Sequence, residues 1–475
     1  MRKSVLLPLI LLVALVIGSL GYAVADAYNL VPGILTIEKQ SLDLPQTVQI
    51  DLNTTKAEAT KGINEQANQV TPEQLKPLMD QLVSQAQHGV DNKSQESASP
   101  DTNARAGAVV IDTASGKTIA QINGNQLMTP ASSSKIIAAA TALDTLGAQY
   151  RFTTSTHFAA GKLYLRGNGD QLLSPNAGNP AAISGHAGLG DLAAKTAKKL
   201  KAQKVSTTQL FLDESIFGDQ NPLPNWKAQG NDRYESKPTP IAINNGLANP
   251  QLSYGYLPDP ALSAAQQFAQ RMKDNGISVE AVQRGTAPKE AAMLAEVKSA
   301  ALHEIVHETL KESNNMLAEV LCRASAAKIG SGTNFAGQIK AAQKVLKKLH
   351  LESAEFANQD CSGLSTEDRI KPALLAAVMQ KAATGSDSQL RPIVSSLPIG
   401  ALDGTLDTRY SQQAASGNVR AKTGSLQRAR SLTGLVTTKS GRTLTFAVII
   451  DSYKEGTGEN ARAAIDNFVN GLATL

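Results

Sequence analysis

Short apolar runs rich in β-branched residues stand at both ends of a region that begins at Gly107, and they predict strands. The five runs are residues 108–112, 117–122, 418–422, 431–437 and 443–450. Between them, Lys135–Leu146 is rich in Ala and Leu and predicts a helix, and Glu459–Leu472 closes the chain as an amphipathic helix. Strands at both ends with helices between them predict an antiparallel sheet that the C-terminal segment completes.

The middle of the chain, about residues 151–300, has a different pattern. Strand-like segments alternate with helix-like ones, at residues 162–166, 192–201, 209–213 and 261–273. This alternation is typical of mixed α/β structure. The whole chain is therefore assigned to the α+β class.

The N-terminus carries an export signal. Arg2 and Lys3 precede Val5–Val24, twenty residues without a charge, which is the length that spans a bilayer with its basic flank in the cytoplasm. Ala23-Val24-Ala25 also resembles a signal-peptidase site. Residues 1–25 are thus a membrane anchor, which the length favours, or a cleaved signal peptide, and in both cases the rest of the chain is extracytoplasmic.

Residues 26–105 have the composition of a tether. They contain one aromatic residue, Tyr28, and many Gln, Asn and Thr, so they offer little apolar surface to offset the entropy lost on ordering. A short helix is expected at Thr71–Gln87, with Thr71 as its N-cap and Pro72 in its first position.

Composition excludes some classes of function. The 475 residues are 42% apolar and carry a net charge of +5, which gives no reason to expect a nucleic-acid partner. Cys322 and Cys361 can form one disulfide, and buried free thiols are the ordinary alternative.

A Ser-x-x-Lys pattern begins the helix at residue 135. Residues three apart share a helix face, so the Lys135 amine can reach the Ser132 hydroxyl and act as its base. The pattern alone is weak, because Ser325–Lys328 matches it too.

Two further motifs follow in order. Ser313-Asn314-Asn315 is a Ser-x-Asn in a helical context, and Lys422-Thr423-Gly424 is a Lys-Thr-Gly on a strand. Each is weak alone, but the order is specific: a hairpin, then Ser-x-x-Lys opening a helix, then Ser-x-Asn, then Lys-Thr-Gly on a strand that two more strands follow.

The order resembles that of the penicillin-recognising serine acyltransferases. It is most similar to the class C low-molecular-mass penicillin-binding proteins, which are D-alanyl-D-alanine carboxypeptidases and endopeptidases. Further matching stretches are Leu310–Met316, Ser362-Gly363-Leu364-Ser365, Asp403-Gly404-Thr405-Leu406 and Ala421–Leu426, whereas Cys361 stands where glycine is expected. The resemblance implies a transpeptidase-like catalytic domain, residues 106–150 plus 301–475, and an inserted domain, residues 151–300.

The same resemblance implies a role for each motif residue. Ser132 would attack a D-alanine carbonyl of a peptidoglycan stem peptide, with Lys135 as the base. Ser313 would pass a proton to the leaving amine, and Asn315 would bind the substrate amide. The Lys-Thr-Gly strand would supply the substrate-binding residues Lys422, Thr423, Gly424 and Ser425, of which Lys422 and Thr423 would hold the terminal carboxylate.

Further implications concern the oxyanion, the insert and the ligands. Backbone N–H groups of Ser132 and Ser425 would stabilise the oxyanion. Asp213 in the insert would contact the amino end of a stem diamino acid, although an acid at a strand end also commonly caps a turn. β-Lactams would inhibit the enzyme, and no metal or cofactor is required.

Three alternatives remain open. His303-Glu304-Ile305-Val306-His307 matches the zinc-protease signature, but no third ligand stands at a convincing position, since Glu319, twelve residues on, is near but unsupported. A serine β-lactamase would need a group that activates water for fast deacylation, and the sequence identifies none. A non-catalytic penicillin- or wall-binding protein would be expected to have lost part of the triplet, and every motif member is present.

Overall fold

The computed structural model describes residues 63–90, 103–218, 221–351, 356–385 and 388–475. The expected anchor or signal, residues 1–25, and the first part of the expected tether lie outside the described residues. Within the described ranges, none of the helices combines the length and apolarity needed to cross a bilayer.

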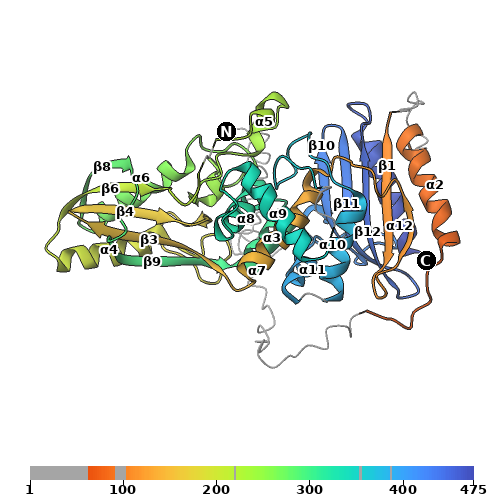
Figure 1. Ribbon diagram of the computed structural model, residues 1–475, viewed down its shortest axis with the longest axis horizontal. Coiled ribbons are helices and arrows are strands. Elements are labelled where there is room, and N and C mark those ends of the chain that lie inside the picture. The colour runs from red at the N-terminus through yellow and green to blue at the C-terminus, as the bar shows by residue number, and fades with distance from the viewer. Residues whose placement is uncertain (1–62, 91–102, 219–220, 352–355, 386–387) are drawn as a thin grey trace, which may run out of the picture. The chain divides into compact units, whose positions relative to one another are not determined.

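A five-stranded antiparallel sheet is assembled from the two ends of the region that begins at Gly107 (Figure 1). Its order is β10 (Val419–Leu426), β11 (Ala429–Thr437), β12 (Thr443–Asp451), β1 (Arg105–Asp112) and β2 (Thr118–Ile122). The early strand β1 pairs with the late strand β12, with Val109 opposite Ala447. The sheet predicted from the sequence, completed by the C-terminal segment, is therefore confirmed.

Both faces of this sheet are buried along its three central strands, β11, β12 and β1, which explains why these strands are mostly apolar runs. Successive side chains of a strand point to opposite faces. In β1, Ala108 and Val110 join one apolar cluster, and Val109 and Ile111 join another. The first cluster includes α12 (Gly458–Ala473), and the second includes the helical layer around α3 (Lys135–Leu146).

The helical layer is formed by segments that lie between β2 and β10 in the sequence. It contains α3, α7 (Leu302–Lys311), α8 (Asn315–Lys328), α9 (Phe335–Lys348), α10 (Pro372–Thr384) and the short α11 (Pro392–Ser396). A disulfide joins Cys322 on α8 to Cys361 in the loop before α10, so the open question about the two cysteines is answered in favour of the bridge.

Helix α2 (Pro72–His88) corrects part of the tether expected over residues 26–105. The predicted N-cap Thr71 accepts a hydrogen bond from the Gln74 N–H, as a capping box requires. The helix then packs on α12 instead of serving as a spacer. The helix as a whole is slightly polar. Its apolar residues nevertheless recur at helical spacing and form one buried stripe, which consists of Leu75, Met79, Leu82 and Ala86.

The inserted region forms a second sheet of mixed direction, in the order β8-β6-β4-β3-β9. The strands are β3 (Arg151–Ala159), β4 (Lys162–Gly167), β6 (Thr207–Asp213), β8 (Ser278–Arg284) and β9 (Ala292–Ala301), with α4 (Leu189–Ala202) and α6 (Pro260–Asp274) packed on them. The inserted region also contains a small parallel pair of strands, β5 (Asp170–Leu173) and β7 (Ile241–Ile243), and the short helix α5 (Pro224–Ala228).

The first and last strands of the insert pair with each other, with Arg151 opposite Ala301. The chain therefore leaves the helical layer after α3 and returns to it at α7. The predicted α+β class, with an antiparallel sheet flanked by helices and an inserted mixed α/β region, is confirmed.

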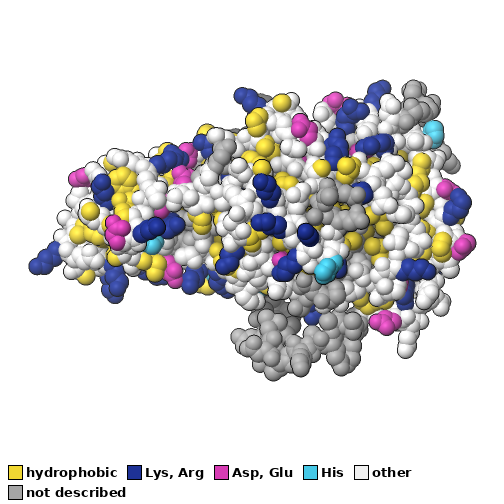
Figure 2. All heavy atoms as spheres, viewed as in Figure 1, with side chains coloured by type: hydrophobic (Ala, Val, Ile, Leu, Met, Phe, Trp, Pro, Cys, Tyr) yellow, Lys and Arg dark blue, Asp and Glu magenta, His cyan; other side chains and the backbone are white. Residues whose placement is uncertain are grey.

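On the face shown in Figure 2, Lys and Arg side chains are spread over the visible surface with Asp and Glu among them. No single basic patch dominates that face, as expected from the small net charge.

Candidate active site

Ser132 lies in a tight 3-10 turn, Ala131–Ser134, that leads into α3. The turn begins with a buried Ala131 at φ +47°, a conformation that costs free energy and that neighbouring structure must enforce. One such neighbour is Gly363, whose φ is +79° and where a Cβ atom would lie 1.9 Å from the Ala131 carbonyl oxygen. The turn and the loop after Cys361 thus pack backbone against backbone.

The structure distinguishes Ser132 from the two serines that follow it. The Lys135 Nζ atom donates to the Ser132 Oγ atom at 2.8 Å. The Ser133 hydroxyl is instead paired with that of Ser431 at 2.8 Å, and the Ser134 hydroxyl accepts from Asn358 at 2.6 Å. Ser132 is therefore the serine of this run that a base can activate.

Lys135 is fully buried and makes three short contacts. Besides Ser132, its Nζ atom donates to the Asn315 Oδ1 atom at 2.7 Å and to the Ser362 carbonyl at 2.6 Å. Burial lowers the pKa of Lys135 to about 8, because the charged amine is poorly solvated there. With this pKa about one amine in ten is neutral at pH 7, and that fraction can accept a proton.

Four buried carboxyl groups oppose this shift by favouring the charged amine, namely those of Glu235, Asp360, Glu319 and Asp368. Burial raises the pKa of Glu319 to about 8 and that of Glu235 well above its usual value. Sequence reasoning assigned none of the four to this site, although it considered Glu319 as a zinc ligand. The four come from three separate segments, Glu319 from helix α8 and the others from loops, and a single acid in a helix or a loop carries no signal of burial.

The Ser-x-Asn motif forms the turn between α7 and α8. Ser313 has φ +58° and lies in the turn itself, Asn314 caps α8 by accepting from the Leu317 N–H, and Asn315 begins the helix. The amide of Asn315 is held at both ends, because its Nδ2 atom donates to the Tyr234 carbonyl at 2.9 Å. The inserted region therefore helps to orient a motif residue of the catalytic part.

The Lys-Thr-Gly motif lies on β10, beside the Ser132 turn. A Cβ atom on Gly424 would lie 2.8 Å from the Pro130 carbonyl oxygen, so the close approach requires glycine. The Lys422 Nζ atom donates to the Thr423 carbonyl at 2.8 Å, and the Thr423 hydroxyl donates to that of Thr405. Burial, followed by repulsion from Lys135, lowers the pKa of Lys422 well below its ordinary value.

A cleft of about 920 Å³ opens over this arrangement and contains Ser132, Ser313, Asn315 and Ser425 in its wall. The inserted region supplies another wall, whose residues include Gln229, Asn231, Arg233, Tyr234, Asn245 and Tyr256. Lys135 and Lys422 lie beneath the surface, and Thr423 is partly exposed on β10. The three motifs predicted to converge are thus brought together.

Asp213 is not brought to this cleft. It is buried, its Oδ1 atom accepts from the Ser215 N–H at 3.0 Å, and its Oδ2 atom accepts from the Ala287 N–H at 3.0 Å. It is not among the residues that line the cleft, and its bonds are those of the alternative, an acid at a strand end that orders the turns around it.

Two of the three His-Glu-x-x-His residues, His303 and Glu304, have structural partners. Glu304 accepts from the Ala301 N–H at 2.7 Å and so caps the first turn of α7, and the His303 ring pairs with the Ala148 carbonyl at 3.1 Å. Among the described residues, no group of three or more His, Cys, Asp or Glu side chains could hold a metal ion.

Comparison with known proteins identifies the family. Residues 86–256 and 256–472 match the D-Ala-D-Ala carboxypeptidase 3 (S13) family. A carboxypeptidase of Mycobacterium tuberculosis is 33% identical over 380 residues, which are 78% of this chain and 80% of that protein. A D-alanyl-D-alanine carboxypeptidase of an Actinomadura species is 27% identical over 421 residues, covering 73% of this chain and 78% of the relative.

A solved structure supports the fold. Penicillin binding protein 4 of Haemophilus influenzae matches with a TM-score of 0.66 at 22% identity, covering 84% of this chain and 99% of the other. The enzyme class predicted from the sequence, a serine-type D-Ala-D-Ala carboxypeptidase, is confirmed by the family match. The chain belongs to the D-Ala-D-Ala carboxypeptidase 3 (S13) family.

Proposed function

We propose that this enzyme hydrolyses the D-alanyl bond of peptidoglycan stem peptides through a Ser132 acyl-enzyme, as a carboxypeptidase and endopeptidase that β-lactams inhibit. The observation that carries the proposal is the 2.8 Å contact between the Lys135 amine and the Ser132 hydroxyl, at the wall of a cleft that also contains Ser313 and Asn315. Penicillin binding protein 4 of Haemophilus influenzae has been solved in complex with a β-lactam, which supports β-lactams as the class of inhibitor.

Acylation begins when the Ser132 oxygen attacks the carbonyl carbon of the penultimate D-alanine and its proton passes to the neutral Lys135 amine. The backbone N–H groups of Ser132 and Ser425 stabilise the oxyanion. The carbon–nitrogen bond then breaks, and the leaving amine takes a proton through Ser313. Water hydrolyses the resulting ester and regenerates the serine.

The pH dependence of acylation tests the role of Lys135. A base must be neutral to accept a proton, and the pKa of Lys135 is about 8. We therefore expect the acylation rate to rise with pH and to level off above a midpoint near 8. The measurement is the second-order rate constant for acylation by a fluorescent penicillin as a function of pH. A flat profile across this range would contradict the assignment.

Lys422 and Thr423 are proposed to bind the free carboxylate beside the scissile bond. The pKa of Lys422 is depressed by burial and by Lys135, and an arriving carboxylate favours the charged amine again. Binding of the substrate then completes the ion pair, so selectivity for a free C-terminus follows from the charge of the site.

Amidation of the substrate tests this selectivity. A stem pentapeptide whose terminal carboxylate is an amide should be hydrolysed with a kcat/KM about 10²-fold lower than the free acid, because a buried amine would be left without its partner. The Lys422→Gln variant should hydrolyse the acid slowly and should lose the discrimination. Equal rates for acid and amide in the wild-type enzyme would argue against the carboxylate site.

The two activities are separated by their products. The purified protein is incubated with a defined stem pentapeptide and with a cross-linked stem dimer, and the products are weighed by mass spectrometry. Loss of D-alanine from the pentapeptide reports carboxypeptidase activity, and cleavage of the dimer reports endopeptidase activity. A long-lived penicillin adduct supports the peptidase, whereas rapid turnover of penicillin would support a β-lactamase.

An extracytoplasmic site of action is part of the proposal, because the stem-peptide substrate lies there. Retention at the membrane through residues 5–24 is also proposed, from their length and their basic flank. Recovery of the full chain in the membrane fraction, with its N-terminal residues present by mass spectrometry, would support an anchor, and a mature N-terminus near Asp26 would support a cleaved signal.

A further inference from the structure

One stripe of helix α8 faces the Lys135 amine and the loop beside it. Asn315, Glu319 and Cys322 are four and three residues apart, so they share one face of the helix. Asn315 accepts from the Lys135 amine, Glu319 accepts from loop backbone, and Cys322 is covalently joined to the loop. The loop in question is residues 360–365, here called the Ser362 loop.

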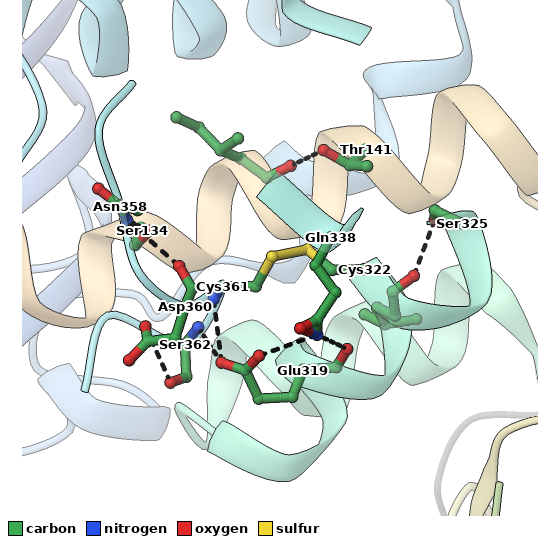
Figure 3. Close-up of a disulfide and its surroundings, with 12 residues drawn as sticks. Ser134, Thr141, Glu319, Cys322, Ser325, Gln338, Asn358, Asp360, Cys361 and Ser362 are labelled. Atoms are coloured by element: carbon green, nitrogen blue, oxygen red, sulfur yellow. Dashed lines mark hydrogen bonds between the residues drawn. A yellow bond between two sulfur atoms is a disulfide. The ribbon is translucent and has the colours of Figure 1, made fainter. Parts of the chain in front are cut away.

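Glu319 holds the Ser362 loop through two backbone donors. Its Oε1 atom accepts from the Cys361 N–H at 3.0 Å and from the Ser362 N–H at 2.7 Å. The side chain is fully buried, and Gln338 donates to its Oε2 atom at 3.1 Å. Figure 3 shows this carboxylate directed at the loop next to the disulfide. Removing it would leave two buried N–H groups without a partner, which is costly.

The disulfide is a second link between helix α8 and the Ser362 loop. Cys322 and Cys361 are both buried, and they pack with Ala138 of α3 and Ala318 of α8. Asp360, in contrast, braces the Ser362 loop internally, since it accepts from the N–H groups of Gly363 and Ser365. Glu319 and the bridge are therefore the groups that hold the loop to α8, whereas Asp360 maintains its shape.

The attachment of the loop to α8 positions the Ser362 carbonyl. It accepts from the Lys135 amine at 2.6 Å, so two of the three acceptors around that amine, Asn315 and Ser362, depend on α8. The third acceptor is the Ser132 hydroxyl itself. An amine held by two fixed acceptors can keep its third contact aligned, and displacement of one acceptor would let it turn away from the hydroxyl.

We propose that Glu319 and the Cys322–Cys361 disulfide are positioning groups for acylation, which together fix the Ser362 carbonyl and thereby hold the Lys135 amine on the Ser132 hydroxyl. The proposal rests on the proposed roles of Ser132 and Lys135. It predicts that loosening the Ser362 loop slows the chemical step and leaves the initial binding of a β-lactam in the cleft unchanged.

Stopped-flow acylation by a fluorescent penicillin separates the two quantities, the dissociation constant of the first complex and the limiting acylation rate. In Glu319→Ala we expect the limiting rate to fall about 10²-fold, and in the Cys322→Ala/Cys361→Ala pair about 10-fold. The substituted side chains do not line the cleft, but Gly363 and Leu364 of the Ser362 loop do. Asp360 and Asn231 still hold these two residues in both variants, so the dissociation constant should stay within about threefold of wild type.

Two further variants distinguish positioning from general loss of structure. Glu319→Gln keeps an oxygen that can accept both N–H groups, but its new amide NH2 meets the Gln338 Nε2 atom, which also donates to the carbonyl of residue 319 at 2.9 Å. Its rate should therefore be well above that of Glu319→Ala and within about tenfold of wild type. Ser325→Ala is the matched control, because Ser325 is buried on the same helix and bonds only the Leu321 carbonyl within its own helix. Its limiting rate should be unchanged, and thermal unfolding verifies that each variant is folded.

Wild-type limiting rates in folded Glu319→Ala and in the cysteine pair would overturn the proposal, and so would a loss that appears only in the dissociation constant. If Glu319→Ala does not fold, the cysteine pair decides, and an unchanged rate there overturns it. Ser132→Ala is run in parallel. An adduct in that variant would refute the proposed nucleophile, whatever the loop variants show.

Discussion

Replacing Ser132 with alanine should abolish the penicillin adduct and reduce hydrolysis of a stem pentapeptide by about 10⁴–10⁶-fold. The hydroxyl is the atom that forms the covalent bond, and its neighbours cannot substitute for it. Ser133 is paired with Ser431 and Ser134 with Asn358, both away from the Lys135 amine. The measurements are mass spectrometry of the protein after exposure to penicillin and kcat/KM for the pentapeptide.

The control for this variant is Ser325→Ala, which removes the serine of the second Ser-x-x-Lys pattern. That serine lies inside α8, and its hydroxyl donates to the Leu321 carbonyl at 2.8 Å, so its loss should leave adduct formation intact. A Ser132→Ala protein that still gained the mass of penicillin would show that another residue is acylated, and the proposed mechanism would be withdrawn.

Lys135→Met should reduce the acylation rate by about 10²–10⁴-fold while the protein stays folded. Methionine has nearly the length of lysine and fits a buried position without an amine to desolvate. The substitution also leaves the Asn315 Oδ1 atom and the Ser362 carbonyl without their donor, which offsets that gain. We therefore expect a thermal midpoint within a few degrees of wild type, measured by circular dichroism.

The pH profile of Lys135→Met supplies a second test. The rising limb expected near pH 8 in the wild-type enzyme should be absent, because the group that titrates has been removed. Lys328→Met removes the exposed lysine of the second Ser-x-x-Lys pattern. This variant should keep the wild-type acylation rate and the rise of that rate with pH. A limb that persists in Lys135→Met would assign the titration to another group, and a near-normal rate would remove Lys135 as the base.

The sequence by itself determined the local elements and the order of the motifs. The helix predicted at Lys135–Leu146 has the same bounds in the structure, and the strands predicted near the C-terminus are β10, β11 and β12. The Thr71 cap was predicted from its own residue type and from Pro72. These features depend on neighbours a few residues apart, so propensity and periodicity are sufficient to find them.

Helical spacing predicted the contact of the Lys135 amine with Ser132, but only the tertiary structure decided which other groups meet there. Asn315 is 180 residues away and the Ser362 carbonyl 227 residues away, and a backbone carbonyl leaves no trace in the residue type. The same holds for Asp213, which belongs to its own turns and not to the cleft, and for α2, whose apolar stripe acquires a partner only when α12 is folded beside it. Contacts between distant segments follow from packing, and local patterning does not encode packing.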